Sequence, residues 1–557
     1  MPMPGPQSRA PLAYTLALDD EHNGSQEQNH PARSPPTPAR MNPLANVLIV
    51  GAGPTGLVLA LWLTRQGVPV RIVDKASGPG ATSRAMVVHA RTLELYRQLD
   101  LDAAVIAAGH RAPAIHLWAQ GKKRATLSFG AAGPGAAGPG AAGQELTPYP
   151  FVLVFPQDQH ERLLVERLKA LGVEVQWQTE CLGFDDFGDH VVVRLRSEDG
   201  SEQRCEAAYV AGCDGARSVV RHQLGTGFTG GTYEKYFYVA DVQASGPTAN
   251  GDVNVALDEA DFVLWLGYDD QGRGRLIGVA DDGSAHAESL GFDDVGHRAL
   301  ASVGLHVAKV HWFSTYRVHH RVADHYRQGR AFLVGDAAHI HSPVGGQGMN
   351  TGIGDAINLA WKLAGVLRHG AHYALLDSYE AERRAFALTL VATTDRAFTF
   401  ITAGGRLADF VRTHIAPRLA SLAYGVGAVR EYAFRLLSQT MIRYRDSPIS
   451  AGQAGTVHGG DRLPWVRAAD NYGPLAAIAW QVHVYGTAGS DLVAWCQAQG
   501  IALHRFDFGP AQAAAGFSRD AAYLIRPDSY VACADADGDP AALQAHLRRC
   551  TGQAPVT

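Results

Sequence analysis

The sequence has few cysteines, and none of them pair in the pattern of a metal or redox site. Its 557 residues include six cysteines, and no two of them form a C-x-x-C pair. This excludes a disulfide framework, a zinc site and a dithiol redox centre, so no metal is expected. The same scarcity is typical of a reducing compartment, and we expect a cytoplasmic location.

The chain also lacks an excess of positive charge. Lysine and arginine total 49 against 54 aspartates and glutamates, a net charge of -5. A surface that binds nucleic acid is usually strongly basic, so no nucleic acid partner is expected. A small-molecule partner fits the composition better.

No hydrophobic run is long enough and unbroken enough to predict a membrane span. The segment Leu44–Leu63 is almost entirely apolar, but Gly51, Gly53, Pro54 and Gly56 interrupt it. Breakers at these positions are typical of a buried strand that turns into a buried helix. No contact with a membrane is expected.

Two segments have a composition that does not support a packed core. Residues 1–40 are rich in Pro, Ser, Gln and Asn and are predicted to form a disordered tail. Residues 130–143 are a Gly/Ala/Pro repeat and are predicted to form a surface loop.

Elsewhere the pattern alternates between strands and helices. A βαβ unit is predicted from a strand at Asn46–Val50, a helix at Thr55–Gln66 and a strand at Pro69–Val73. Between about 233 and 318, short apolar runs separated by Gly/Asp turns predict a mostly antiparallel sheet. Helical patterns return at Gly354–Arg368, Leu376–Arg396 and Leu407–Ser438. A fresh alternation follows, with strands at Ala479–Val484, Ala502–Phe506 and Ala522–Ile525 and helices at Asp491–Gln499 and Ala541–Arg549.

The first strand of the βαβ unit leads directly into Gly51-Ala-Gly53-Pro-Thr-Gly56. Glycines at this spacing allow a tight turn, a close approach to a pyrophosphate and close packing of helix and strand. Asp74 ends the second strand, where an acid binds ribose hydroxyls. Strand, helix and acid together predict a dinucleotide site.

Two further strand ends carry an aspartate beside a glycine. Asp214-Gly215 follows an apolar run at Ala207–Ala211, and Gly335-Asp336 follows the run that starts at Arg330. The missing Cβ lets a ligand lie against the backbone, within reach of the carboxylate. Taken singly, each aspartate could equally be a helix cap.

In this order and at these separations, the three segments resemble the signatures of the class A flavoprotein aromatic hydroxylases, which have the para-hydroxybenzoate hydroxylase fold. The resemblance extends through Ser83–Glu94 and His341–Asn350 and covers about 45–400. The chain is most similar to phenol-type and 3-hydroxyphenylpropionate-type hydroxylases, polyketide hydroxylases and rifampicin monooxygenases.

The resemblance implies an α/β fold with a Rossmann-like FAD-binding domain, an inserted antiparallel substrate domain and a thioredoxin-like C-terminal domain. Without a C-x-x-C pair, that last domain is expected to serve structure or dimerisation, and the protein to be a monomer or homodimer. The expected parts are a tail at 1–40, the FAD-binding domain at 41–225 and 318–400, the substrate domain at 226–317, a helical linker at 401–453 and the thioredoxin-like domain at 454–557.

The resemblance also assigns roles to residues. Pro343 matches the position whose carbonyl lies beside the substrate hydroxyl and is the catalytic candidate. Substrate contacts are expected from His89, Tyr238 and Trp265, with Tyr236 and Trp312 as further candidates, although aromatic residues at strand spacing are often plain core. The cofactor-binding residues are expected to be Gly51, Gly53, Pro54, Thr55, Gly56, Asp74, Lys75, Arg84, Gln157, Asp214, Gly335, Asp336, Gly346, Gly348, Met349 and Asn350.

The implied chemistry belongs to FAD. NADH or NADPH reduces the flavin, molecular oxygen is captured at its C4a position, and one oxygen atom passes to an aromatic or polyketide-like substrate. The sequence has no second dinucleotide fingerprint, so the nicotinamide is expected to bind transiently. Two alternatives remain open: a monooxygenase that inactivates an antibiotic of the rifampicin or tetracycline type, and a flavin-binding interaction protein without turnover.

Overall fold

The computed structural model describes residues 45–80, 85–129, 143–257, 262–279, 291–294, 300–301, 303–342, 344–402 and 427–552. Several predictions concern residues outside these ranges and are not addressed by the structure. They are the tail at 1–40, nearly all of the repeat at 130–143, the middle of the linker at 403–426, Arg84 and Pro343.

The first sheet is built on the predicted βαβ unit, which the structure confirms. Strand β1 pairs in parallel with β2 and β10, and β10 pairs in parallel with β17. In this register Val50 lies between Val73 and Gly212, and Gly212 lies opposite Leu333. The four strands therefore end at one edge of the sheet. Their bounds, and those of the antiparallel strands that extend the sheet, are β1 (Ala45–Val50), β2 (Val70–Val73), β10 (Glu202–Gly212), β17 (Ala331–Leu333), β8 (Thr179–Asp186), β9 (Val191–Ser197) and β16 (Arg327–Gln328).

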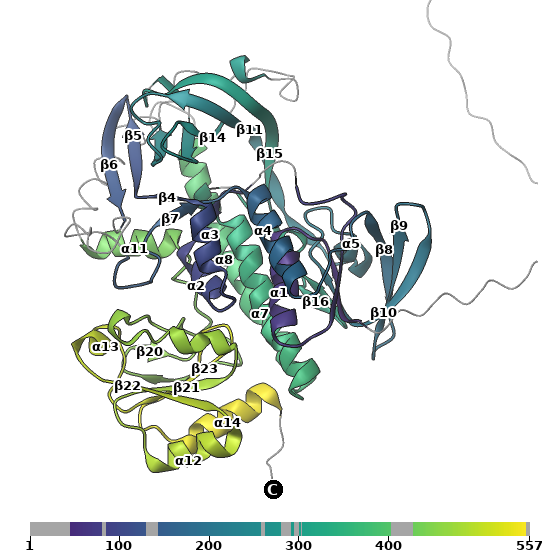
Figure 1. Ribbon diagram of the computed structural model, residues 1–557, viewed down its shortest axis with the longest axis vertical. Helices are drawn as coiled ribbons and strands as arrows, with labels where there is room; N and C mark the ends of the chain where they lie inside the picture. Colours follow the sequence, from purple (N-terminus) through teal and green to yellow (C-terminus); the bar gives the residue numbers. More distant parts are fainter. Residues whose placement is uncertain are drawn as a thin grey trace, which may run out of the picture. The chain divides into compact units, whose positions relative to one another are not determined.

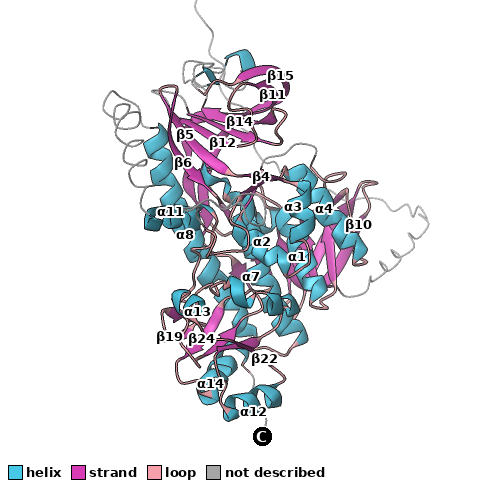
Figure 2. Ribbon diagram, turned by 60° about the vertical axis from the view of Figure 1, so that its left-hand side comes forward, coloured by secondary structure: helices cyan, strands magenta, loops and turns pink. Residues whose placement is uncertain are grey.

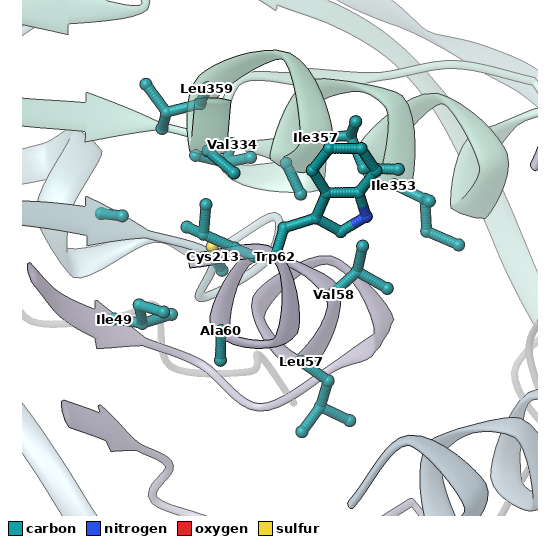
Figure 3. Packing of buried hydrophobic residues seen from close by; sticks show 14 of the residues in the cluster. Ile49, Leu57, Val58, Ala60, Trp62, Cys213, Val334, Ile353, Ile357 and Leu359 are labelled. Carbon is teal, nitrogen blue, oxygen red and sulfur yellow. The ribbon is translucent and has the colours of Figure 1, made fainter. Parts of the chain in front are cut away.

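The apolar residues that follow Gly56 form the core beside this sheet. Helix α1 (Pro54–Arg65) is buried from Gly56 to Leu63. Trp62 points from α1 toward Ile353 and Ile357 of helix α7 (Gly348–Arg368), as Figure 3 shows. In the part of the chain that the structure describes, no helix has the length and apolarity to cross a bilayer.

The remaining helices of this part pack on α1, on α7, on one another or beside the strands. Helix α7 begins six residues earlier than predicted, because glycine, asparagine and threonine in its first turns are weak helix formers that hide the start. The helices are α2 (Ala90–Arg97), α3 (Asp102–Ala108), α4 (Gln157–Ala170), α5 (Val219–Leu224), α8 (Asp377–Thr402) and α11 (Gly427–Leu437).

The second sheet has the strand order β18-β15-β11-β14-β13-β12-β5-β6. The expected antiparallel pairing is found throughout except between β12 and β5, which are parallel. Strands β5 and β6 come from residues 114–128, which the sequence had assigned to the FAD-binding domain; Figure 2 shows them beside β12 and β14. The bounds are β5 (Ala114–Ala119), β6 (Lys122–Ser128), β11 (Phe228–Ser245), β12 (Val253–Leu257), β13 (Phe262–Gly267), β14 (Arg273–Val279), β15 (His306–Ala323) and β18 (His339–Ile340).

A small sheet lies against one face of this second sheet. It has the order β3-β7-β4, and its strands are β3 (Val87–Val88), β4 (His110–Ala112) and β7 (Val152–Val154). Met86 and Val87 pack there against Leu264 and Leu266 of β13. We call this face of the second sheet its inner face. The outer face packs instead on Leu300, Val303 and Leu305.

The C-terminal part contains a six-stranded sheet with the order β20-β19-β24-β23-β21-β22, coloured yellow-green in Figure 1. All three predicted strands and both predicted helices are present. Strand β24 was missed, because its sequence carries small and polar residues that give no strand signal. The elements are β19 (Ala451–Ala454), β20 (Val457–His458), β21 (Gln481–Tyr485), α12 (Ser490–Gln499), β22 (Ala502–Phe506), α13 (Pro510–Ala514), β23 (Ala522–Ile525), β24 (Val531–Asp535) and α14 (Pro540–Thr551).

The stability of this fold should depend on pH through its buried histidines. Burial lowers the pKa of His89 to about 4 and the pKa values of His160 and His483 to about 3. The pKa of a histidine in an unfolded chain is about 6.5. Below that pH, protons therefore bind the unfolded chain more readily than the folded protein. As the pH falls from 6.5 to 4, each of these histidines should lower the free energy of unfolding by about 1.4 kcal/mol for every pH unit.

We therefore expect the urea midpoint to fall clearly between pH 7 and pH 5, as followed by circular dichroism. The variant His306→Gln changes an exposed histidine and should keep the same pH dependence. A midpoint that does not move between these pH values would contradict the expectation.

Candidate functional site

Strands β1 and β10 end in a contact that only glycine permits. Gly51 has a φ of +104°, and a Cβ at this position would lie 2.3 Å from the carbonyl oxygen of Cys213. A Cβ on Gly56 would lie 1.9 Å from the carbonyl oxygen of Gly51. The loop Gly51–Gly56, called the fingerprint loop below, is therefore held tightly between β1, α1 and the end of β10.

Gly53 differs from its neighbouring glycines because its surroundings are open. A Cβ there would meet no described atom within 4 Å. Gly53 is also the N-cap of α1, no side chain caps this helix end, and Pro54 at its first turn carries no N–H. The partially positive end of α1 thus faces open space, which is the arrangement that binds a phosphate.

Asp74 connects the end of β2 to the fingerprint loop. One carboxylate oxygen accepts a hydrogen bond from the Ala52 N–H at 2.7 Å, and the other accepts from the Ala76 N–H at 2.8 Å. Each carboxylate oxygen can accept a further bond, so a ribose hydroxyl can still donate to it. Lys75 follows directly and is exposed.

Asp214 lies at the next strand end, beside Gly51. Its Oδ2 accepts from the N–H groups of Val219 and Val220 at the start of α5, at 2.7 and 3.3 Å. Its Oδ1 is buried and has no hydrogen-bond partner among the described residues. Burial raises the pKa of this carboxyl. An orphaned acceptor in this position calls for a donor from a ligand.

The third strand end brings Gly335 against α1. Gly335 has a φ of +62°, and a Cβ there would lie 2.7 Å from the Thr55 hydroxyl oxygen. Its N–H donates to Asp355 of α7 at 3.1 Å. Asp336 comes next and is exposed at the same sheet edge. All three glycine- and aspartate-bearing segments therefore converge.

Gln157 lies at the start of α4, where it holds the backbone beside Arg84. Its Oε1 accepts from the Ala85 N–H at 3.0 Å, and its Nε2 donates to Glu161 at 2.8 Å. Glu161 in turn accepts from the Gly80 N–H at 2.8 Å. Helix α4 thus holds the backbone at Gly80 and at Ala85.

The segment 344–350, called the Gly346 loop below, is fixed by Asn350 and His89. The Asn350 Nδ2 donates to the carbonyl oxygens of Gly346 and Val87, at 3.0 and 2.7 Å. The His89 Nε2 lies 3.1 Å from the same Gly346 oxygen, so this nitrogen carries the proton. His89 is only 5% exposed, and burial lowers its pKa to about 4. This neutral ring thus holds the Gly346 carbonyl oxygen in place, and the expected contact of His89 with substrate stays a prediction.

Gly348 and Met349 belong to the first turn of α7, directly after this loop. Met349 is buried against the main core. Gly345 and Gly346 both have positive φ values, of +81° and +64°. The chain thus turns sharply directly before helix α7 begins.

Two of the expected substrate residues lie on the same face of the second sheet. Tyr238 and Trp265 point to the outer face of the second sheet, where both are almost completely buried in an apolar cluster. Successive side chains of a strand point to opposite faces, so their neighbours Phe237 and Leu264 point to the inner face.

The inner face also carries a polar cluster that sequence reasoning missed. The Tyr268 hydroxyl donates to Asp241 at 2.5 Å, and the fully buried Arg275 donates to both oxygens of Asp241 at 2.7 and 2.6 Å. Trp312 pairs with Asp241 across β11 and β15, and the Arg275 guanidinium lies 5.5 Å from its ring centre. The sequence signal that could have revealed this cluster is the presence of polar residues within otherwise apolar strands. Tyr236, the remaining candidate, packs beside the outer cluster.

Comparison with known proteins agrees with this geometry. The model of the family described as FAD binding domain matches residues 45–394. A 6-methylpretetramide 4-monooxygenase from Streptomyces rimosus is 33% identical over 90% of this chain and 93% of its own length. A rifampicin monooxygenase from Rhodococcus hoagii is 33% identical over 72% of this chain and 79% of its own length.

A solved structure shares the arrangement of the chain. The anhydrotetracycline hydroxylase OxyS from Streptomyces rimosus superposes with a TM-score of 0.72 at 28% identity, covering 92% of this chain and 99% of that one. The open space at Gly53 and the orphaned oxygen of Asp214 fit FAD as the cofactor. The chain therefore belongs to the FAD binding domain family and is a flavin monooxygenase of the class A aromatic hydroxylase group.

Proposed function

We propose that this enzyme uses FAD, NADH or NADPH, and molecular oxygen to hydroxylate a multi-ring aromatic molecule of the polyketide type. The observation that carries the proposal is the convergence of Gly51, Asp214 and Gly335 at one sheet edge. The names of two relatives, which act on 6-methylpretetramide and anhydrotetracycline, support the substrate class.

In this proposal, different residues at the sheet edge bind different portions of FAD. The fingerprint loop, including Pro54 and Thr55, holds the pyrophosphate, and Asp74 with Lys75 binds the adenosine ribose. Asp214, Gly335 and Asp336 bind the ribityl chain. Gly346, Gly348, Met349 and Asn350 present backbone N–H groups to the flavin ring, where such groups stabilise negative charge. Arg84, Gln157 and Pro343 keep their expected roles as predictions.

When bound and reduced by the nicotinamide, FAD would supply the activation of molecular oxygen and the transfer of one of its atoms to the substrate. The protein orients the substrate ring and excludes water. We propose that the polar cluster of Asp241, Tyr268 and Arg275 performs the orientation. Arg275 donates to both oxygens of Asp241, and the Tyr268 oxygen can accept from a phenolic or enolic hydroxyl while its own O–H donates to Asp241.

The C-terminal part is proposed to be thioredoxin-like. Its elements β21, α12, β22, α13, β23, β24 and α14 follow one another in the order of that fold, with β21 parallel to β22 and antiparallel to β23. Cys496, Cys533 and Cys550 are buried and unpaired with one another, which supports a structural role.

An antibiotic-inactivating monooxygenase is the second candidate, and the rifampicin monooxygenase relative favours it. The two functions differ in substrate and share the same site. A screen for substrate-stimulated NADH and NADPH oxidation over phenols, naphthoquinones, tetracyclic aromatics and rifampicin separates them. We expect the strongest stimulation from a tetracyclic aromatic, with a product one oxygen atom heavier by mass spectrometry. Selective turnover of rifampicin would favour the second candidate.

Gly53→Val should abolish FAD retention. The valine side chain would fill the open space in front of α1, where the pyrophosphate is proposed to bind. Purified protein should lose the flavin absorbance near the visible maximum while keeping its circular dichroism spectrum. Gly172→Val, at an exposed turn with similarly open surroundings, is a control for valine at a glycine site, although its φ of +81° adds strain. A yellow, fully loaded Gly53→Val protein would contradict the assignment.

Tyr268→Phe should raise the KM for the aromatic substrate about five- to tenfold, because one buried hydrogen bond is lost. The kcat should change much less, since the oxygen-transfer chemistry belongs to the flavin. Tyr238→Phe is the matched control on the outer face and should leave KM unchanged. Equal effects of both replacements on KM would show that the inner face does not bind the substrate.

A further inference from the structure

The β23–β24 loop of the C-terminal part reaches helix α2 through Arg91. The Arg91 guanidinium donates to the Asp528 carbonyl oxygen at 2.9 Å and to the Ser529 hydroxyl at 3.0 Å. It also lies 4.8 Å from the ring centre of Tyr530. Arg91 is 3% exposed, and Asp528, Ser529 and Tyr530 are equally buried. Helix α2 and this loop are therefore tightly joined.

The next residue of α2 contacts the Gly346 loop. The Thr92 hydroxyl donates to the Asn350 Oδ1 at 2.8 Å, and the same oxygen accepts from the His89 N–H at 2.9 Å. The Nδ2 of the same Asn350 side chain donates a hydrogen bond to the Gly346 carbonyl oxygen. A displacement of α2 by the C-terminal part would thus be transmitted through Thr92 to the Gly346 loop.

Helix α8 makes a similar connection through the adjacent residues Glu382 and Arg383. The first contacts the C-terminal part, and the second contacts Asp355 of α7. Both oxygens of Glu382 accept from Arg526 of the C-terminal part, at 2.7 and 3.1 Å. Arg383 donates to Asp355 at 2.5 Å, and Asp355 accepts from the Gly335 N–H. All of these side chains are less than 4% exposed. Separating these buried charges from their partners would be strongly unfavourable, so this connection is expected to be rigid.

The two connections meet around one internal cavity of about 20 Å³, which is space for about one water. Its lining includes residues from both connections and from the C-terminal loop. They are Arg91, Thr92, Asn350, Arg383, Asp528 and Tyr530. The Gly335 segment and the Gly346 loop are therefore both fixed from the same side, by the same loop of the C-terminal part.

We propose that the loop Arg526–Tyr530 positions the two segments that hold the flavin, so that the C-terminal part sets the affinity and electronic environment of FAD. The expected role of this part was structural or dimerising, and the proposal assigns it a direct influence on the cofactor. The inference rests on the proposed function, because it takes the Gly346 loop and the Gly335 segment as flavin-binding.

The test compares three single variants of the full-length holoenzyme. Ser529→Ala and Arg91→Met weaken the connection at its C-terminal end, and Thr92→Val cuts it at the Gly346 loop. The readouts are the dissociation constant of FAD, measured by flavin fluorescence, and the shape of the visible absorption bands. We expect the dissociation constant to rise about five- to tenfold, the factor that one buried hydrogen bond carries, with a shift of the flavin bands.

A matched control lies on the same helix. Arg97 forms an ion pair with Asp470 of the C-terminal part at 2.8 Å, but the two side chains are 30% and 58% exposed, and the pair has no contact with the Gly346 loop. Arg97→Leu should leave FAD affinity and spectrum unchanged. If Arg91→Met does not fold, Ser529→Ala remains as the milder change at the same contact.

The double variant Ser529→Ala/Thr92→Val decides whether the effect travels through α2. We expect the two changes to be non-additive, with Ser529→Ala adding little once Thr92 is replaced. Additive effects, or a Ser529→Ala protein identical to the wild type in affinity and spectrum, would overturn the proposal. FAD loss in Gly53→Val alongside such a result would leave the proposed function intact and reject only the coupling.

Discussion

The close approach of Gly51 to the carbonyl of Cys213 is the constraint on which the site depends. It places the ends of β1 and β10 in contact, and the parallel register of β2, β1, β10 and β17 brings Asp74 and Gly335 to the same edge. A side chain at Gly51 or Gly56 would overlap backbone atoms, so these positions admit only glycine. Gly53 has no such neighbour, and its restriction comes from the ligand that the open space accommodates.

Buried charge gives the site its rigidity. Burial by itself would raise the pKa of the Asp355 carboxyl, but Arg383 and His339 lower it and keep it ionised. Glu382 is held in the same way by Arg526 and Lys362. Charges in these positions are stable only with their partners in place, since an unpaired buried charge is strongly unfavourable. The C-terminal part supplies one of these partners and is thus integral to the frame around the cofactor.

The two faces of the second sheet differ in character. The outer face, with Tyr238 and Trp265, is an apolar core, whereas the inner face carries Asp241, Tyr268 and Arg275 among apolar residues. Polar groups fixed on a sheet are more precisely placed than groups on loops, which suits the orientation of an aromatic ring. A family whose relatives act on different aromatic molecules can vary this face without disturbing the flavin site.

The sequence by itself determined the βαβ unit and the fingerprint loop, because glycine spacing and a strand-end acid are local requirements. The family and the cofactor followed from the resemblance that the three strand-end segments carry. The sequence also located most strands and helices of the C-terminal part from periodicity. Only the tertiary structure decided that β5 and β6 join the second sheet, that Tyr238 lies on its outer face, and that His89 holds Gly346. Strand pairing, face and buried partner depend on residues far apart in the chain, and periodicity within one segment carries no information about them.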